Sequence, residues 1–175
     1  MATWRGALAA IFITAAAGFS STQAAQMKVP FNFQWGESQA RVEKSLDGIK
    51  ARIVDRQTNG TRTKLVVEGI PQKQLRRTVF HFRDDMLEEI ELQFGDSSWD
   101  TIQYERSFDE VRRNVDSKYG MGRLLTRTRT REQDVMQTLS GYQWTQNSMA
   151  LRLFLFVAEK DAETHRVLSL HYRQI

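Results

Sequence analysis

Apolar and polar residues alternate along most of the chain after residue 30, a pattern typical of β-strands with one buried and one exposed face. In one segment, for example, Ile90 and Leu92 share a face with Glu88, whereas Leu87 falls on the wetter face with Glu89. Strands are therefore expected at 31–35, 49–53, 61–68, 77–83, 86–94, 142–146, 149–158 and 167–173.

Two segments have the spacing of helices instead. Ser38 is a suitable N-cap for a helix that carries Val42 and Leu46 on one side and ends near residue 48. A Ser-x-x-Glu capping box predicts a second helix at 107–119, with helical structure beginning as early as residue 99.

The segment 124–140 fits two interpretations. Residues 126–131 alternate like a strand, whereas Val135 and Leu139 have the spacing of a short helix. Under both interpretations, the order of elements indicates an α+β fold. We expect an antiparallel sheet of about seven to eight strands with two main helices on one face. A tandem helix-plus-four-strand repeat, at about 31–95 and 99–175, is a further expectation.

The first 25 residues have the three-part layout of a secretory signal peptide. Arg5 gives a basic start, Ala7 to Phe19 are mainly apolar, and Thr22 and Ala24 are the small residues before the cut. The alternative is an uncleaved membrane anchor, but the apolar run is shorter than the ~20 residues that cross a bilayer. We therefore expect a signal peptide at 1–25 and a single periplasmic or secreted domain at 26–175.

The amino-acid composition excludes several classes of functional site. The chain contains no cysteine, so a disulfide, a thiol nucleophile and a cysteine-ligated metal are excluded. Its 25 basic and 21 acidic residues are well mixed, with a formal net charge of +4, which argues against a nucleic-acid partner. After residue 25 no apolar run reaches membrane-spanning length, so no transmembrane segment is expected there.

Three local patterns carry a family resemblance. Trp35-Gly36-x-Ser38 leads into the first helix, and Tyr119-Gly120 ends the second helix. Between them, a strand pair runs Phe80-His81-Phe82-Arg83-Asp84-Asp85-Met86-Leu87. This order resembles a broad group of uncharacterised bacterial exported proteins over residues 31–175. In shape it also resembles the beta-lactamase inhibitor protein and the BamE-type outer-membrane assembly lipoproteins. The resemblance implies a scaffold that acts by protein contact, although the chain lacks the acylated cysteine of the lipoproteins and the disulfides of the inhibitor.

Candidate catalytic groups are sparse. His81 with Asp84 or Glu88 is the best carboxylate–histidine combination, and it defines the alternative function of an envelope hydrolase. Glu89 and Glu91 are interpreted as a solvated strand face opposite Arg77 and Arg83. His165 and His171 share a strand face but lie about 20 Å apart, and a pairing of His81 with His171 has no spacing signature. We expect no metal site and no cofactor.

Binding candidates are clearer. Arg127, Arg129 and Arg131 alternate with threonines, so a strand would align them on one face, with Arg123 extending the row. Guanidinium groups in such a row are suited to bind phosphate or carboxylate groups of a partner. The alternative is a solvent-exposed strand face whose positive charge is balanced by nearby acidic residues. Trp99 follows a polar stretch and is a candidate anchor for a partner, unless it packs at the start of the second helix.

Taken together, these features favour an exported binding module of the bacterial cell envelope that contacts a protein or an anionic envelope component. An envelope hydrolase is the competing class, and a purely structural envelope protein is a third.

Export can be tested on the native protein. Mass spectrometry of the envelope and secreted fractions should find a chain that starts near Ala25, because the signal peptide is removed during translocation. A chain that still starts at Met1 and is recovered from the cytoplasm would contradict this prediction.

Overall fold

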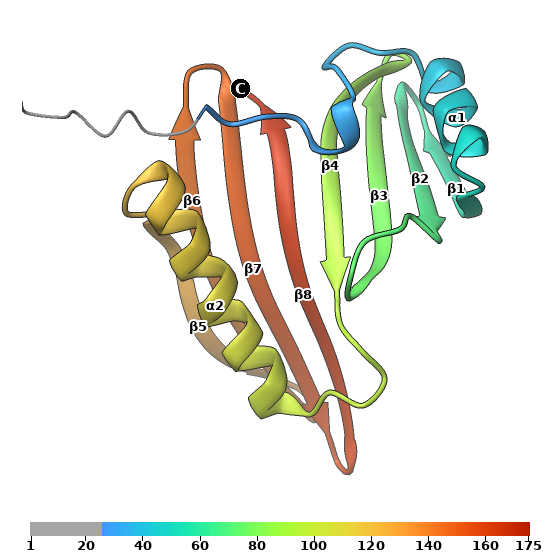
Figure 1. The fold of residues 1–175 in the computed structure, drawn as a ribbon. Coiled ribbons are helices and arrows are strands. Elements are labelled where there is room, and N and C mark those ends of the chain that lie inside the picture. The colour runs from blue at the N-terminus through green and yellow to red at the C-terminus, as the bar shows by residue number, and fades with distance from the viewer. Residues whose placement is uncertain (1–25) are drawn as a thin grey trace, which may run out of the picture.

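Eight antiparallel strands form one sheet in the computed structural model, which describes residues 26–175 (Figure 1). The predicted signal peptide at 1–25 lies outside the described residues. Strand order across the sheet is β1-β2-β3-β4-β8-β7-β6-β5. The strands are β1 Arg52–Asn59, β2 Arg62–Glu68, β3 Leu75–Arg83, β4 Met86–Phe94, β5 Arg123–Glu132, β6 Val135–Gln146, β7 Met149–Lys160 and β8 Glu163–Gln174.

Two α-helices lie on the same side of the sheet (Figure 1). Helix α1, Gln39–Gly48, begins as predicted after Ser38, whose hydroxyl accepts from the Arg41 N–H. Helix α2, Thr101–Tyr119, begins earlier than its predicted capping box, because the Asp100 carboxylate accepts from the Gln103 N–H at 2.8 Å. No helix between residues 26 and 175 has the length and apolar character needed to span a membrane. The predicted α+β class is confirmed.

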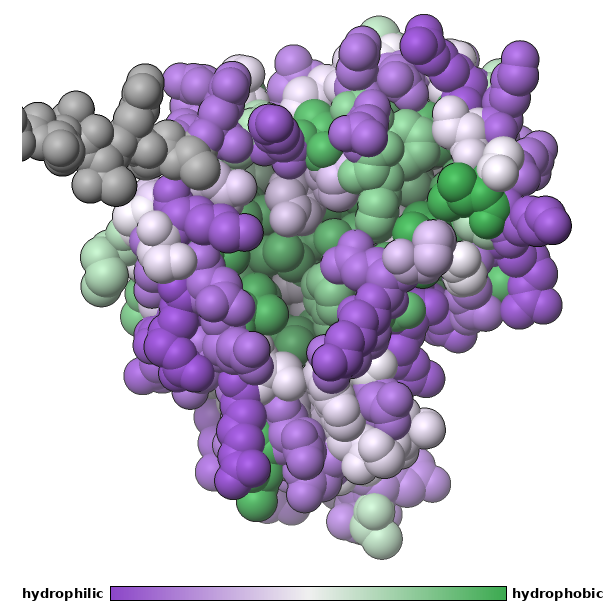
Figure 2. Space-filling view, viewed as in Figure 1, coloured by the Kyte–Doolittle hydropathy of each residue, from purple (hydrophilic) through white to green (hydrophobic). Residues whose placement is uncertain are grey.

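The hydrophobic core lies between the helices and one face of the sheet. Val42 and Leu46 of α1 and Phe108 of α2 pack against apolar side chains from the strands. Those strand residues are Leu65, Val67, Phe80, Phe82, Leu87, Ile90, Leu92, Leu151, Leu153, Leu155, Leu168 and Leu170. From the helix side, Figure 2 shows an apolar patch between the two helices and hydrophilic residues around it.

Three predicted elements differ from the structure. The strand expected at 49–53 begins only at Arg52, as β1, because residues 49 and 50 form the turn after α1. Residues 30–32 form a 3-10 turn rather than a strand, because Phe31 and Asn32 have positive φ values of 59° and 61°. This turn directs Phe33 into the core, where its ring lies edge-on to Phe80 at 5.2 Å. The predicted short helix at 135–139 is part of β6, so the segment 124–140 consists of two paired strands and their turn.

β-Bulges change which face several residues occupy. Across β3 and β4, His81 pairs with Glu89 and Phe82 with Leu87, so Glu88 is the extra residue. The predicted position of Leu87 on the wetter face is therefore wrong: it is 1% exposed and lies in the core. A one-residue bulge reverses the alternation of side chains beyond it.

Core packing by α1 can be tested with a matched pair of variants. Leu46 is 0% exposed, whereas the nearby Ile49 is 46% exposed. Leu46→Ala should lower the free energy of unfolding by about 2–5 kcal/mol, because it leaves a cavity under α1. Ile49→Ala should change it by less than about 1 kcal/mol. Urea unfolding followed by circular dichroism measures both, and equal losses would show that α1 is not anchored through Leu46.

Candidate binding surface on the open face of the sheet

Neither described helix covers the second face of the sheet, which we call the open face (Figure 1). Residues that pair directly across antiparallel strands project from the same face. One such row crosses six neighbouring strands. Its members, in order from β3 to β5, are Val79, Glu91, His171, Arg152, Gln143 and Arg123. Charged and amide side chains therefore occupy the middle of the open face.

His171 is the centre of a hydrogen-bonded network on this face. Its Nδ1 lies 2.8 Å from Glu89 Oε1, and its Nε2 lies 2.9 Å from Ser169 Oγ. The Phe154 ring lies nearly perpendicular to the imidazole, at an interplanar angle of 88°, with ring centroids 5.4 Å apart. Both imidazole nitrogens have partners, and the aromatic contact restricts the ring further. The orientation of His171 is thus determined before any ligand binds.

Glu91 is the second carboxylate of the network. It accepts a 2.7 Å hydrogen bond from Gln93 Nε2, and its oxygens lie 3.5 Å from His81 Nε2 and 4.0 Å from His171 Nε2. Burial raises the pKa of Glu91, but the His81 and His171 imidazoles and the Gln93 amide outweigh it and lower that pKa to about 2. The folded protein therefore favours a charged carboxylate in a largely buried position.

The pKa of Glu89 is lowered for similar reasons. Burial raises its pKa, but the contact with His171 and the nearby His81 and Arg173 outweigh burial and lower the pKa below its usual value. Arg173 Nε lies 3.9 Å from Glu89 Oε2, at the edge of the network.

The predicted pairing of Glu89 and Glu91 with Arg77 and Arg83 is wrong. Arg77 pairs with Glu68 at 3.0 Å, and Arg83 pairs with Glu88 at 3.1 Å. The strand β8 supplies the partner that sequence reasoning missed, because it pairs with β4 and brings His171 beside both carboxylates.

Of the predicted hydrolase residues, His81 and Glu88 line one pocket beside β2 but have separate ion-pair partners. Asp84 is in the tight turn between β3 and β4, with a φ of 49°, and Glu88 is bound by Arg83. His81 instead contacts Glu91 on the open face. Within residues 26–175, no group of three or more histidine, aspartate or glutamate side chains is arranged to hold a metal ion.

Ser169, His171 and Glu89 have the order of contacts of a nucleophile, a base and an acid. Ser169 is only 5% exposed and lies in the middle of β8, paired with β4 on one side and β7 on the other. In that position its backbone is paired with strands on both sides, whereas a nucleophile in acyl transfer needs an accessible hydroxyl beside N–H donors. The geometry suits a fixed polar network better than an acyl-transfer site.

The predicted arginine row is only partly assembled. Arg127, Arg129 and Arg131 pair with alternate residues of β6 and share the helix side of the edge strand β5. Arg123 pairs with Gln143 and projects from the open face, because Leu125 is the extra residue of a β-bulge. We call the three aligned residues, Arg127, Arg129 and Arg131, the arginine row.

The arginine row borders a groove beside α2. Arg127 and Arg129 line this groove together with Glu105 and Asp109 of the helix. Arg127 Nη2 also lies 3.4 Å from the Tyr142 hydroxyl. Acidic side chains of the helix therefore lie near part of the row.

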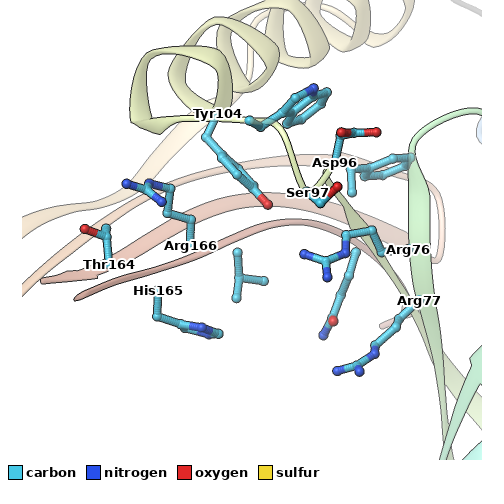
Figure 3. A pocket seen from close by; sticks show the side chains of 12 residues that line it. Arg76, Arg77, Asp96, Ser97, Tyr104, Thr164, His165 and Arg166 are labelled. Carbon is cyan, nitrogen blue, oxygen red and sulfur yellow. The ribbon is translucent and has the colours of Figure 1, made fainter. Parts of the chain in front are cut away.

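Trp99 is half-buried at the start of α2, where its ring lies edge-on to Tyr104 at 5.3 Å. Its position matches the packing alternative considered from sequence. Trp99 also lines a pocket at the end of β4, together with Arg76, His165 and Arg166 (Figure 3).

Comparison with models of known protein families, with curated protein sequences and with solved structures gives no match.

Glu91 predicts how stability depends on pH. Its pKa is about 2 in the folded protein against a usual value of 4.5, so the carboxylate stabilises the fold above pH 4.5. This contribution is lost as the pH falls from 4.5 towards 2. Over that range the free energy of unfolding should fall by on the order of 2 kcal/mol more in the wild type than in Glu91→Gln.

Urea unfolding at stepwise pH values measures this difference. Glu110→Gln on the exposed side of α2 is the control and should follow the wild type. Parallel pH curves for the wild type and Glu91→Gln would contradict the role given to this carboxylate.

Proposed function

We propose that the protein is an exported binding module of the bacterial cell envelope, which docks a protein partner on the open face of its sheet. The observation that carries this proposal is the fixed network of Glu89, Glu91 and His171 on a face that no described helix covers. Export is supported by the signal-peptide pattern of the first 25 residues.

A preorganised polar surface suits protein recognition. Side chains held in place by hydrogen bonds lose little conformational entropy when a partner binds. Around the network, charges of both signs alternate, with Arg173 beside Glu89 and Arg152 donating to Gln143 at 2.8 Å. Mixed charges complement a partner of mixed charge, and they provide specificity more than general attraction to a polyanion.

Aromatic side chains add apolar contact area to the same face. Phe154 and Phe156 project from β7 on the open face and are half-buried. Aromatic groups surrounded by polar residues are typical of the central part of protein interfaces.

An anionic envelope component is the second candidate partner, and the arginine row favours it. Three guanidinium groups on one side of an edge strand can bind phosphate or carboxylate groups through charge-assisted hydrogen bonds. Glu105 and Asp109 beside the row lessen the local positive potential, so we place this candidate second.

We also infer that the domain is a tandem of two helix-plus-four-strand units, at about 31–95 and 99–175. The order of elements supports this inference, because each helix is followed by four strands and the last strands, β4 and β8, pair with each other. An open face formed by both units would be wider than either unit offers alone.

One set of variants tests both candidate partners. Arg152→Glu/Arg173→Glu reverses charge on the open face, and Arg127→Ser/Arg129→Ser/Arg131→Ser removes the arginine row. Arg113→Glu on the exposed side of α2 is the matched control. Each variant is used in crosslinking and affinity capture from envelope extract, after circular dichroism has verified its fold.

We expect the open-face variant to lose at least ten-fold in capture of a partner that the wild type and Arg113→Glu retain, because reversed charges oppose the partner's surface. If only the arginine-row variant loses capture, and capture by the wild type weakens as the salt concentration rises, the anionic partner is supported instead. Unchanged capture by both variants would overturn the docking proposal.

A further inference from the structure

A pocket lies where the two halves of the sheet separate. Strand β4 ends at Phe94, which pairs with Leu168 of β8, so residues 163–167 of β8 extend beyond it with only β7 as a neighbour. The loop 95–100 and the start of α2 close the other side (Figure 3). The pocket encloses about 320 Å³, which is at the lower end of the range for small-molecule sites.

Arginines dominate the wall of this pocket. Arg76, Arg77 and Arg166 line it, against one carboxylate, that of Asp96. Arg77 is already paired with Glu68 at 3.0 Å. Arg76 and Arg166 have no ion pair within 4.0 Å among residues 26–175, which leaves an excess of positive charge.

Asp96 offsets only part of this excess, because its carboxylate is bonded to its own turn. Its Oδ1 accepts from the Ser98 N–H at 2.9 Å and from the Ser98 hydroxyl at 2.7 Å. These bonds lower its pKa, with a smaller contribution from Arg76. In Figure 3 the carboxylate points away from the middle of the pocket, towards its own turn.

Local backbone geometry directs Arg76 into the pocket. On β3, Leu75 pairs with Phe94 and Arg77 with Gln93, so Arg76 is the extra residue of a β-bulge. The Arg76 Cδ and the Tyr104 hydroxyl both occupy space that a side chain at Gly95 would need. Glycine at position 95 therefore allows the guanidinium and the hydroxyl to approach the same region.

Hydrogen-bond donors surround the middle of the pocket. The Tyr104 hydroxyl points inward beside Arg76 (Figure 3) and makes no hydrogen bond to another residue of the described chain. Arg166 is held against the first residue of α2, because its Nε donates to Thr101 Oγ1 at 2.7 Å. In Figure 3 its guanidinium end points away from the Tyr104 hydroxyl, so Arg166 contributes charge at the wall rather than a direct contact.

We propose that this pocket binds a phosphate group, with Arg76 and Tyr104 as the direct ligands and Arg166 adding positive potential at the wall. Phosphate matches the site because it offers more acceptor oxygens than a carboxylate, and a guanidinium fork binds two of them at once. This site goes beyond the docking function proposed above and does not depend on it. The phosphate can belong to a small soluble molecule or to a phospholipid headgroup.

Calorimetric titration with inorganic phosphate and with glycerol 3-phosphate, at constant ionic strength, tests the proposal. Arg76→Gln should weaken binding at least ten-fold, and Tyr104→Phe should weaken it several-fold while retaining the buried ring. Arg76→Lys should recover only part of the affinity, because it keeps the charge and loses the fork. Arg113→Gln, remote from the pocket, should bind like the wild type.

Sedimentation with vesicles distinguishes the two sources of phosphate. Binding to phosphatidylglycerol vesicles that Arg76→Gln abolishes, and that glycerol 3-phosphate competes away, would assign a lipid headgroup. Binding of glycerol 3-phosphate without vesicle binding would assign a soluble ligand. The proposal is overturned if none of these probes binds, if acetate binds as tightly as phosphate, or if Arg76→Gln has no effect while thermal melting shows it to be folded.

Discussion

Antiparallel pairing between β4 and β8 joins two groups of four strands into one continuous sheet. Six residue pairs connect these strands, from Glu89 with Arg173 to Phe94 with Leu168. On the core side, the pairing places Leu92 beside Leu170, and both are buried. On the open face, the same pairing places Glu91 beside His171. One contact between distant segments thus builds part of the core and the polar network together.

The polar network is stable because each partly buried charge in it is paired. A carboxylate in a largely buried position costs free energy unless it is paired, and Glu91 has two imidazoles and an amide within reach. Removing one partner would leave the others without compensation. This dependence holds the face in one arrangement, which is the property that a docking surface requires.

Single-residue bulges determine the direction of the side chains that matter most for binding. The bulge at Glu88 places Leu87 on the core face of the sheet. The bulge at Leu125 places Arg123 on the open face, opposite to the face of the arginine row. A third bulge makes Arg76 an extra residue at the end of β3, beside the pocket. Each bulge disturbs the sheet locally and gives one side chain an orientation that regular alternation would not provide.

Most of the secondary structure could be predicted from local sequence. The alternation of apolar residues in β7 and β8 and the capping serine before α1 act through neighbours in the chain, so a short window contains the relevant physics. The alignment of Arg127, Arg129 and Arg131 was predictable for the same reason. The prediction failed at Phe31 and at Leu87, where positive φ values and a bulge interrupt the regular pattern.

The candidate sites depend on the tertiary structure. His171 and Glu89 are separated by 82 positions in the sequence, and only the pairing of β4 with β8 brings them into contact. Arg76, Tyr104 and Arg166 come from β3, α2 and β8, and no local spacing indicates that they meet. Local alternation of side chains determines which face of a regular strand a residue occupies. Strand order and bulges determine which residues become its neighbours. Strand order and bulges depend on the free energy of packing the whole sheet, which no short segment of sequence contains.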